Sequence, residues 1–169
     1  RFIHMLAFSG PRVQKAAAWL DDRLFSSRLK AVPDTPPIFV TSLARGGTTA
    51  LLNAFNDMPG IATHRYRDMP FITAPLLWAR LSGSGARKVT RRKRAHGDGL
   101  EIDLNSPEAF DEVFWKLFWP EKYTPRRIAL WQAEDAKPAA RAFFARHFRK
   151  IRLLRDTEDG RYLSKNNAN

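Results

Sequence analysis

The chain has 169 residues, a length that suits one domain with a buried core, and a formal net charge of +12. It has no cysteine, which excludes a disulfide framework, a thiolate metal site and a cysteine nucleophile. The positive charge favours anionic partners, from nucleotides and acidic glycans to nucleic acids and membrane surfaces. Cysteine-free chains suit a reducing compartment, so we expect a cytoplasmic protein.

The first predicted element is a helix over residues 11–30, in which apolar side chains share one broad face. The segment 34–37, Asp-Thr-Pro-Pro, ends this helical pattern. No apolar run approaches the ~20 residues that a membrane-spanning helix needs. We expect the natural N-terminus to lie upstream of Arg1, where a signal or anchor segment would be placed.

A strand, a glycine-rich turn and a helix are predicted next, within residues 38–57. The sequence IFVTSLARGGTT, residues 38–49, joins a short apolar run to a turn with one arginine and two glycines, and an amphipathic helical pattern follows. At such a junction backbone N–H groups converge and the helix dipole favours negative charge. Glycine has no Cβ, so the backbone can approach a ligand closely. This segment therefore predicts a binding site for phosphate or sulfate.

Two common nucleotide-binding patterns do not fit this turn. A nucleotide-hydrolase loop places a lysine directly before the hydroxyl residue that binds magnesium, but here Gly47 precedes Thr48 and the cation is Arg45. The Gly-x-Gly-x-x-Gly dinucleotide fingerprint is also absent. The segment instead resembles the 5′-phosphosulfate loop of sulfotransferases, Pro-Lys/Arg-Ser-Gly-Thr-Thr, with Ala44 in place of proline and Gly46 in place of serine.

The resemblance implies a cofactor, PAPS (3′-phosphoadenosine 5′-phosphosulfate), and a product, PAP. No metal is expected, because fixed cations suffice for a sulfuryl group and the sequence shows no metal-ligand spacing. Gly46 lacks the hydroxyl of serine but keeps the backbone N–H, so the anion cradle should survive. The cofactor-binding residues that the resemblance implies are Arg45, Gly46, Gly47, Thr48 and Thr49.

The acceptor hydroxyl also needs a general base, and the sequence offers three candidates. We rank His96 first, since glycines around it leave the backbone free to shape a pocket; Asp68 is second and His64 third. The segment 58–64 resembles the part of sulfotransferases where a substrate-facing acid or base often sits. For each candidate, a role as general base and a role as a loop residue that caps backbone groups are equally compatible with the sequence. Glu101 and Glu108 remain open as alternatives for the base.

The middle of the chain is predicted to be largely irregular. Residues 71–81 form a short helix interrupted near Pro75, and residues 82–99 form a basic loop. This loop either contacts an anionic acceptor or is simply solvated. The second interpretation is favoured, because most runs of like charge in proteins are solvated segments. Nucleic-acid binding is not expected, because the loop has no interleaved aromatic residues and no zinc or helix-turn-helix pattern is present.

Two further helices and a strand complete the pattern. Ser106 and Pro107 predict a helix start, with apolar residues at helical spacing through Phe118. A long basic helix is predicted from Pro138 to about Leu154, with its charged residues and His147 on the solvent side. The aromatic residues of the earlier helix, Trp115, Phe118 and Trp119, read as core rather than as an acceptor pocket.

The final strand, YLSKN from residue 162, resembles the sulfotransferase strand whose terminal lysine reaches the transferring sulfuryl group. Lys165 matches that lysine, whereas Asn167 stands where proline or histidine is usual. Without the resemblance, Lys165 and Arg45 are ordinary surface charges. We expect this strand to pair in parallel with the strand at Ile38, since helical segments separate the two.

These elements predict an α/β fold of the P-loop NTPase-like kind, with a parallel sheet between layers of helices. We expect residues 1–36 to form an N-terminal helical segment and residues 37–169 to form the N-terminal part of a sulfotransferase domain. The 3′-phosphate site of that family lies downstream of the final strand. The fold and the cofactor site are therefore expected to be incomplete in this chain.

The expected function is in-line transfer of a sulfuryl group from PAPS to an acceptor hydroxyl without a metal ion, akin to phosphoryl transfer. Lys165 and Arg45 would stabilise the charge that grows on the departing phosphate. Carbohydrate, lipid, peptide and small-molecule acceptors stay open, and the basic composition suits an anionic one. Two alternatives are a non-catalytic anion- or nucleotide-binding module and a nucleotide kinase, which the missing loop lysine disfavours.

Overall fold

The computed structural model describes residues 10–42, 46–83, 92–93, 101–124 and 127–166. A three-stranded parallel sheet lies at its centre, in the order β1-β5-β2. These strands span Ile38–Val40 (β1), Arg161–Lys165 (β5) and Ile61–Ala62 (β2). The middle strand, β5, pairs through its second half with β1 and through its first two residues with β2. The predicted parallel pairing of the strands at Ile38 and Tyr162 is confirmed.

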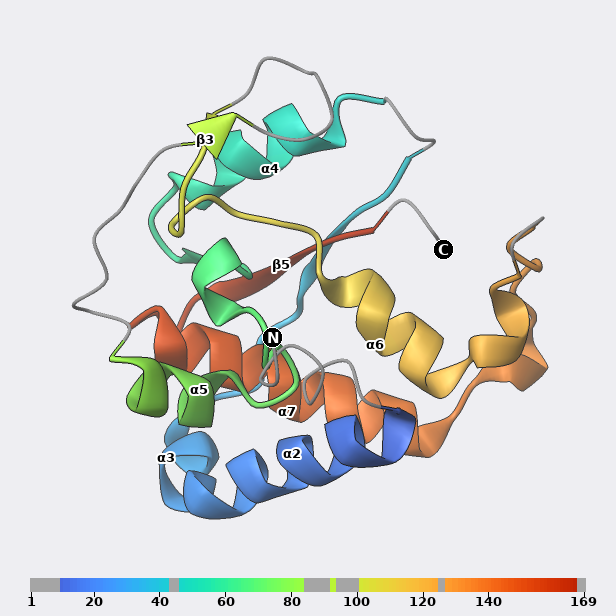
Figure 1. The fold of residues 1–169 in the computed structure, drawn as a ribbon, viewed down its shortest axis with the longest axis horizontal. Helices are drawn as coiled ribbons and strands as arrows, with labels where there is room; N and C mark the ends of the chain where they lie inside the picture. Colours follow the sequence, from blue (N-terminus) through green and yellow to red (C-terminus); the bar gives the residue numbers. More distant parts are fainter. Residues whose placement is uncertain (1–9, 43–45, 84–91, 94–100, 125–126, 167–169) are drawn as a thin grey trace.

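Helices cover both faces of this sheet (Figure 1). One face carries α4 (Thr48–Asn56) and the other carries α7 (Pro138–Leu154). Beyond α7 lies an outer layer of α2 (Pro11–Leu24), α3 (Ser26–Ala31) and α5 (Pro75–Ser82). The chain is therefore an α/β protein with a parallel sheet flanked by helices, as predicted.

Prolines and glycines set several helix bounds. Pro11, Pro75 and Pro138 are the first residues of α2, α5 and α7. Proline is favoured at this position because the N–H that it lacks would make no hydrogen bond within the helix. The predicted bounds of α7 are confirmed, and the predicted helix over residues 11–30 is present with a break at Phe25, which separates α2 from α3.

The predicted helix start at Ser106 is wrong. The helix α6 spans Asp111–Phe118 instead. Ser106 closes a tight turn with Asp103: its N–H donates to Oδ1 of Asp103 over 2.9 Å, and its Oγ accepts from the N–H of Asp103 over 2.9 Å. Pro107 then forms an isolated bridge with Arg65. Both residues are thus used in a turn and a bridge before the helix begins.

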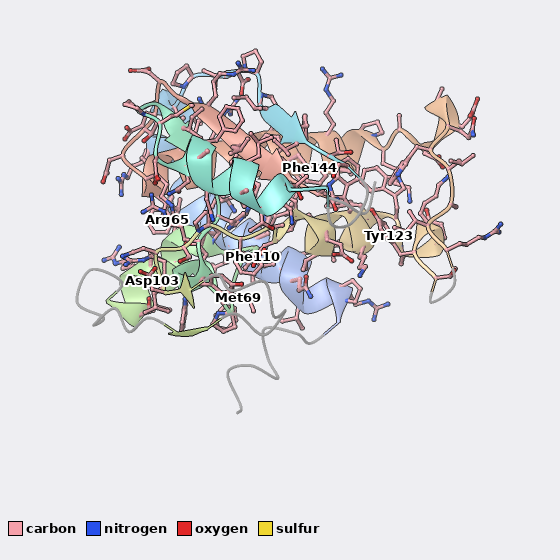
Figure 2. The ribbon with its side chains drawn as sticks, turned by 90° about the horizontal axis from the view of Figure 1, so that it is seen from above. Arg65, Met69, Asp103, Phe110, Tyr123 and Phe144 are labelled. Carbon is pink, nitrogen blue, oxygen red and sulfur yellow. The ribbon has the colours of Figure 1, made fainter. Side chains whose placement is uncertain are left out.

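The remaining described elements are short. Residues 92–93 (β3) and 101–102 (β4) form an antiparallel pair, which places a strand within the segment predicted as a basic loop. Three single 3-10 turns are η1 (Tyr66–Asp68), η2 (Pro120–Lys122) and η3 (Ala133–Asp135). The part of the chain that holds η2, η3 and Tyr123 extends to one side of the molecule (Figures 1 and 2).

The largest core lies between α7, α6 and the sheet. Phe114 and Ile151 are fully buried there, and the ring of Phe148 stacks on that of Tyr162 at 4.3 Å between centroids. Trp119 belongs to the same core, so the interpretation of the α6 aromatics as core residues is confirmed. A separate small core on the other face joins Val40 and Leu163 to Leu52 of α4.

The prediction that the polar residues of α7 face solvent is wrong for three of them. His147, Lys150 and Arg152 are each 1% exposed. Lys150 lies 3.2 Å from Asp21 in an ion pair and donates to the carbonyl of Ala18. Lys150 and Arg152 are buried because α2, α3 and the segment after them cover the outer side of α7. His147 is buried on the other side of the helix, beside His64 and Phe114.

None of the helices in the described part of the chain combines the length and the apolar composition required to cross a bilayer.

Candidate functional site

The glycine turn leads from the end of β1 into the N-terminus of α4. Gly47 has φ +76° and a Cβ added there would meet nothing within 4 Å, so glycine is favoured by the backbone conformation and not by crowding. Thr48 is buried as the first residue of α4. The first N–H groups of any helix have no partner within the helix, so this junction can present donors to an anion. Arg45 lies outside the described residues.

Lys165 lies at the same edge of the sheet as the glycine turn. It is opposite Val40, the last residue of β1, and the N–H of Asn166 donates to the carbonyl of Val40 over 3.0 Å. Side chains alternate along a strand, so Lys165 shares a face with Leu163, which packs against Leu52 of α4. The structure therefore brings Lys165 to the face and the edge at which α4 begins.

The other candidates fall elsewhere. His96 lies outside the described residues, while His64 and Asp68 are buried, 1% and 2% exposed. They are hydrogen-bonded to Arg155 and His147. The ring of His64 also contacts that of Tyr162, which together with Ser164 is hydrogen-bonded to Asp111. We call these seven residues the buried polar cluster.

Asp68 is the most heavily bonded carboxylate of the buried polar cluster. Its Oδ2 accepts from His64 Nδ1 over 3.0 Å, from the backbone N–H of Arg65 over 2.9 Å and from Arg155 Nη2 over 2.6 Å. Burial alone would raise its pKa, but the hydrogen bond from His64 and the charge of Arg155 outweigh burial and lower the pKa to about 2. Asp68 is thus ionised near neutral pH, and this low pKa makes it a weak proton acceptor.

His64 connects Asp68 to His147, whose Nε2 lies 2.8 Å from the Nε2 of His64. An ionised Asp68 can only accept, so Nδ1 of His64 carries the proton that the carboxylate receives. Burial, followed by the charges of His64 and Lys150, lowers the pKa of His147 well below its usual value. His147 is therefore neutral, and one proton between the two Nε2 atoms makes the hydrogen bond that joins it to His64.

Asp111 forms the other end of the cluster, at the first turn of α6. It accepts from the hydroxyl of Tyr162 over 2.6 Å and from the hydroxyl of Ser164. Burial raises the pKa of Asp111, although the neighbouring His64 charge opposes that rise. The cluster thus ties α6, α7, β5 and the segment after β2 into one unit.

This geometry favours a structural role for His64 and Asp68. Both are enclosed by aromatic and charged neighbours, and Asp68 already accepts four hydrogen bonds through its two oxygens. The assignment of either residue as the general base stays a prediction, as does the assignment of His96.

Sequence reasoning missed most of the buried polar cluster, although one signal was available. Phe143, His147 and Ile151 are four residues apart on α7, which places the histidine on the apolar face of the helix. Asp111 and Arg155 carried no comparable signal, because their partners are far away in the sequence. The described residues contain no group of three or more histidine, aspartate or glutamate side chains that could hold a metal ion.

Comparisons of this chain with protein-family models, with curated proteins and with solved structures found no match.

Proposed function

We propose that this chain is a PAPS-dependent sulfotransferase whose 5′-phosphosulfate site is the P-loop-like edge formed by β1, the glycine turn and α4. The observation that carries the proposal is the position of Lys165. Gly46–Thr49 and Lys165 come from distant parts of the sequence, and the pairing of Val40 with Lys165 puts the end of β5 beside the end of β1, which leads into α4. A cation near the N-terminus of a helix suits a bound phosphosulfate.

The proposed reaction uses these groups at the departing phosphate. The acceptor oxygen forms a bond to sulfur while the bond from sulfur to the bridging phosphate oxygen breaks, and the hydroxyl proton passes to a base. Negative charge grows on the bridging oxygen, where Lys165, Arg45 and the amides at the start of α4 would stabilise it. His96 remains our first choice for the base.

Titration calorimetry with PAP, first without and then with magnesium, tests the cofactor site. We expect metal-independent binding by the full chain. Arg45→Ala should weaken it about 10- to 100-fold, because a charge-assisted hydrogen bond contributes roughly 1.5–3 kcal/mol. Arg141→Ala is the matched control, since Arg141 is an exposed arginine on α7, and it should bind PAP like the parent. A folded protein that binds no PAP would make an anion-binding module the better proposal.

Lys165→Ala separates binding from chemistry. If Lys165 acts on the transition state, kcat should fall about 10²- to 10³-fold while the affinity for PAP changes much less. Parallel measurements of PAPS turnover and of PAP binding supply both numbers. Unchanged turnover would remove Lys165 from the mechanism. A requirement for magnesium together with ATP binding would instead favour the kinase alternative.

A further inference from the structure

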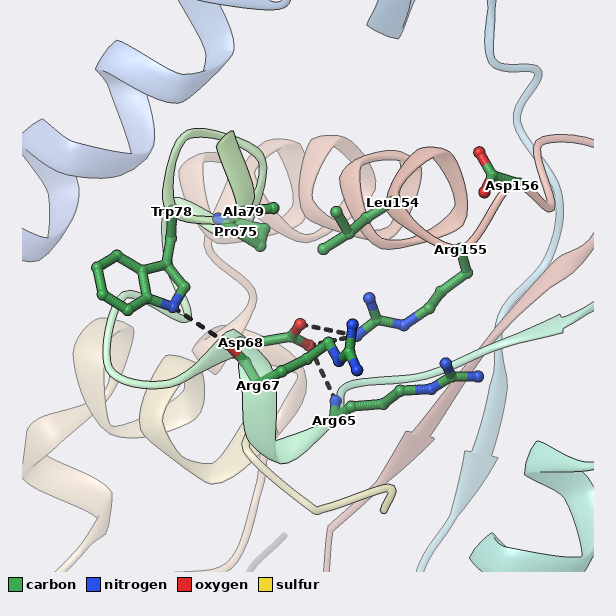
Figure 3. Close-up of a pocket in the computed structure, with 9 residues that line it drawn as sticks. All are labelled: Arg65, Arg67, Asp68, Pro75, Trp78, Ala79, Leu154, Arg155 and Asp156. Carbon is green, nitrogen blue, oxygen red and sulfur yellow. Dashed lines mark hydrogen bonds and ion pairs between the residues drawn. The ribbon is translucent and has the colours of Figure 1, made fainter. Parts of the chain in front are cut away.

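A pocket of about 160 Å³ lies near the start of β5, at the opposite end of that strand from Lys165 (Figure 3). It is formed by η1, α5 and the end of α7, and its lining includes Arg65, Arg67, Asp68, Trp78, Leu154 and Arg155. At about 3.3 Å per residue, the length of β5 separates its two ends by roughly 13 Å. The pocket is therefore distinct from the glycine turn.

Three arginine side chains lie on one side of the Asp68 carboxylate in this pocket (Figure 3). Arg155 donates through Nη2 to both oxygens of Asp68, over 2.8 and 2.6 Å, and through Nε to the carbonyl of Thr63 over 3.2 Å. Arg67 donates to the side chain of Asn105. Asp156 lies at the far rim, and the ion pair of the Asp68 carboxylate is with Arg155.

The guanidinium of Arg65 makes no ion pair within the described residues, and its Nε is buried without a hydrogen-bond partner. Burial lowers its pKa first and the charge of Arg155 lowers it further, while the charges of Asp68 and Asp57 offset this lowering only in part. Asp68 cannot satisfy Arg65 as well, because its oxygens already accept from Arg155, from His64 and from the backbone.

Arg152 shows what a purely structural arginine looks like in this fold. It is more deeply buried than Arg65, yet its guanidinium donates to the hydroxyl of Thr35 and to the backbone carbonyls of Pro33, Glu158 and Gly160. Burying a charged group without such partners is costly. The Nε of Arg152 also lacks a partner, but its Nη atoms donate to the protein, whereas the Nη atoms of Arg65 make no hydrogen bond within the described residues and can donate to an added anion.

We propose that this pocket binds one oxyanion group, a sulfate, phosphate monoester or carboxylate, on Arg65 and Arg155. A guanidinium presents paired N–H donors that match two oxygens of such a group. Trp78, held by a 3.1 Å hydrogen bond from its Nε1 to the carbonyl of Arg67, and Leu154 form the apolar wall beside the carbon skeleton of the ligand. The volume lies below the ~300–1,000 Å³ of typical ligand pockets, so it accommodates a small anion or one end of a larger molecule.

Titrations of the full chain with sodium sulfate and with glucuronate, at constant ionic strength set with chloride, test the proposal. We expect saturable binding of at least one of them, and at least tenfold weaker binding by Arg65→Gln. Arg80→Gln is the matched control, because Arg80 is an exposed arginine on α5 outside the pocket. Anion binding that persists in Arg45→Ala but is weakened in Arg65→Gln belongs to this pocket and not to the glycine turn.

Preference for sulfate would identify a tetrahedral anion, and preference for glucuronate would identify a carboxylate on a sugar-sized skeleton. Equal binding by the parent and Arg65→Gln, or binding of neither anion by the folded parent, would overturn the proposal. Urea unfolding in chloride buffer, without the test anions, gives a second measurement. The urea concentration at the midpoint of unfolding should be unchanged or higher in Arg65→Gln. A clearly lower midpoint would show that Arg65 is a structural arginine.

Discussion

Two consecutive residues of β5 belong to two different kinds of polar region. Ser164 points into the buried polar cluster and donates to Asp111, whereas Lys165 shares the opposite face with Leu163, beside the glycine turn and α4. In the cluster, polar groups satisfy one another and connect elements that are distant in the sequence. At the edge, the start of α4 and a cation lie near one another, where we propose that a ligand binds. A one-residue step along a strand thus separates groups that hold the fold from groups that we assign to the reaction.

The largest expected effect comes from breaking the buried polar cluster at Asp68. Asp68→Asn removes the charge that Arg155 and His64 share, and it leaves a buried guanidinium without its ion pair. Loss of one partner of a buried pair costs about 3–5 kcal/mol, so the free energy of unfolding should fall by that amount. Urea unfolding followed by circular dichroism measures it. A loss below about 1 kcal/mol would mean that the cluster does not hold the fold.

Acid should weaken the same cluster in the parent protein. The pKa of Asp68 is about 2 in the folded chain and 3.8 as a free side chain, so the ionised form favours folding. This contribution is fully present above about pH 4 and is lost as the pH falls through about 2, and it amounts to roughly 2 kcal/mol. Asp21 and Asp111 act in the opposite direction, because burial raises their pKa values.

Urea unfolding at steps from pH 5 to pH 2 measures this loss. The free energy of unfolding should fall less steeply with acid in Asp68→Asn than in the parent. Equal slopes in the two proteins would assign the acid sensitivity to other carboxylates.

The glycine edge should respond differently, with a smaller loss of stability and a larger loss of binding. Gly47→Ala places a side chain at φ +76°, which costs about 1–2 kcal/mol in the left-handed region. Any adjustment of the turn also moves the amides at the start of α4, so PAP affinity should fall at least tenfold. Gly10→Ala is the control, since Gly10 has a negative φ and open space around it. A Gly47→Ala protein with the affinity of the parent would separate this turn from the anion site.

The smallest effect is expected on the exposed side of α6. Glu112 forms an exposed ion pair with Lys116 one turn later, while the preceding residue, Asp111, is buried in the cluster. Pairs of this kind contribute about 0.3–0.5 kcal/mol, so Glu112→Gln should change the unfolding free energy by less than about 0.5 kcal/mol. A loss as large as that of Asp68→Asn would contradict the division between exposed and buried charges.

The features that could be predicted from the sequence depend on nearby residues. Pro138 and the apolar spacing after it define α7, and the order of strand, glycines and helix defines the edge between β1 and α4. Lys165 could be assigned to that edge as well, because parallel strands bring their carboxyl ends together.

The features that could not be predicted depend on partners that are far away. Arg152 looked like a solvent-exposed charge, and its burial depends on carbonyls of Pro33 and Gly160 that no local pattern associates with it. The arginine pocket escaped prediction for the same reason, since Arg65 and Arg155 meet only after the chain has folded. The prediction at Ser106 was wrong for the opposite reason. The local sequence favours a helix start there, but Ser106 forms a turn with Asp103 instead.

The place of β5 in the sheet has a consequence for the order in which this protein assembles. β1, α4 and β2 leave the ribosome early, but β1 and β2 pair with β5 and not with each other. Until β5 has been synthesised, both strands lack their neighbour and expose unpaired backbone edges to other chains. Closure of the sheet requires contacts between distant parts of the sequence, and such contacts slow folding. The edge formed by the glycine turn and Lys165 is therefore completed late in folding, and nascent chains that stall before β5 should be prone to aggregation.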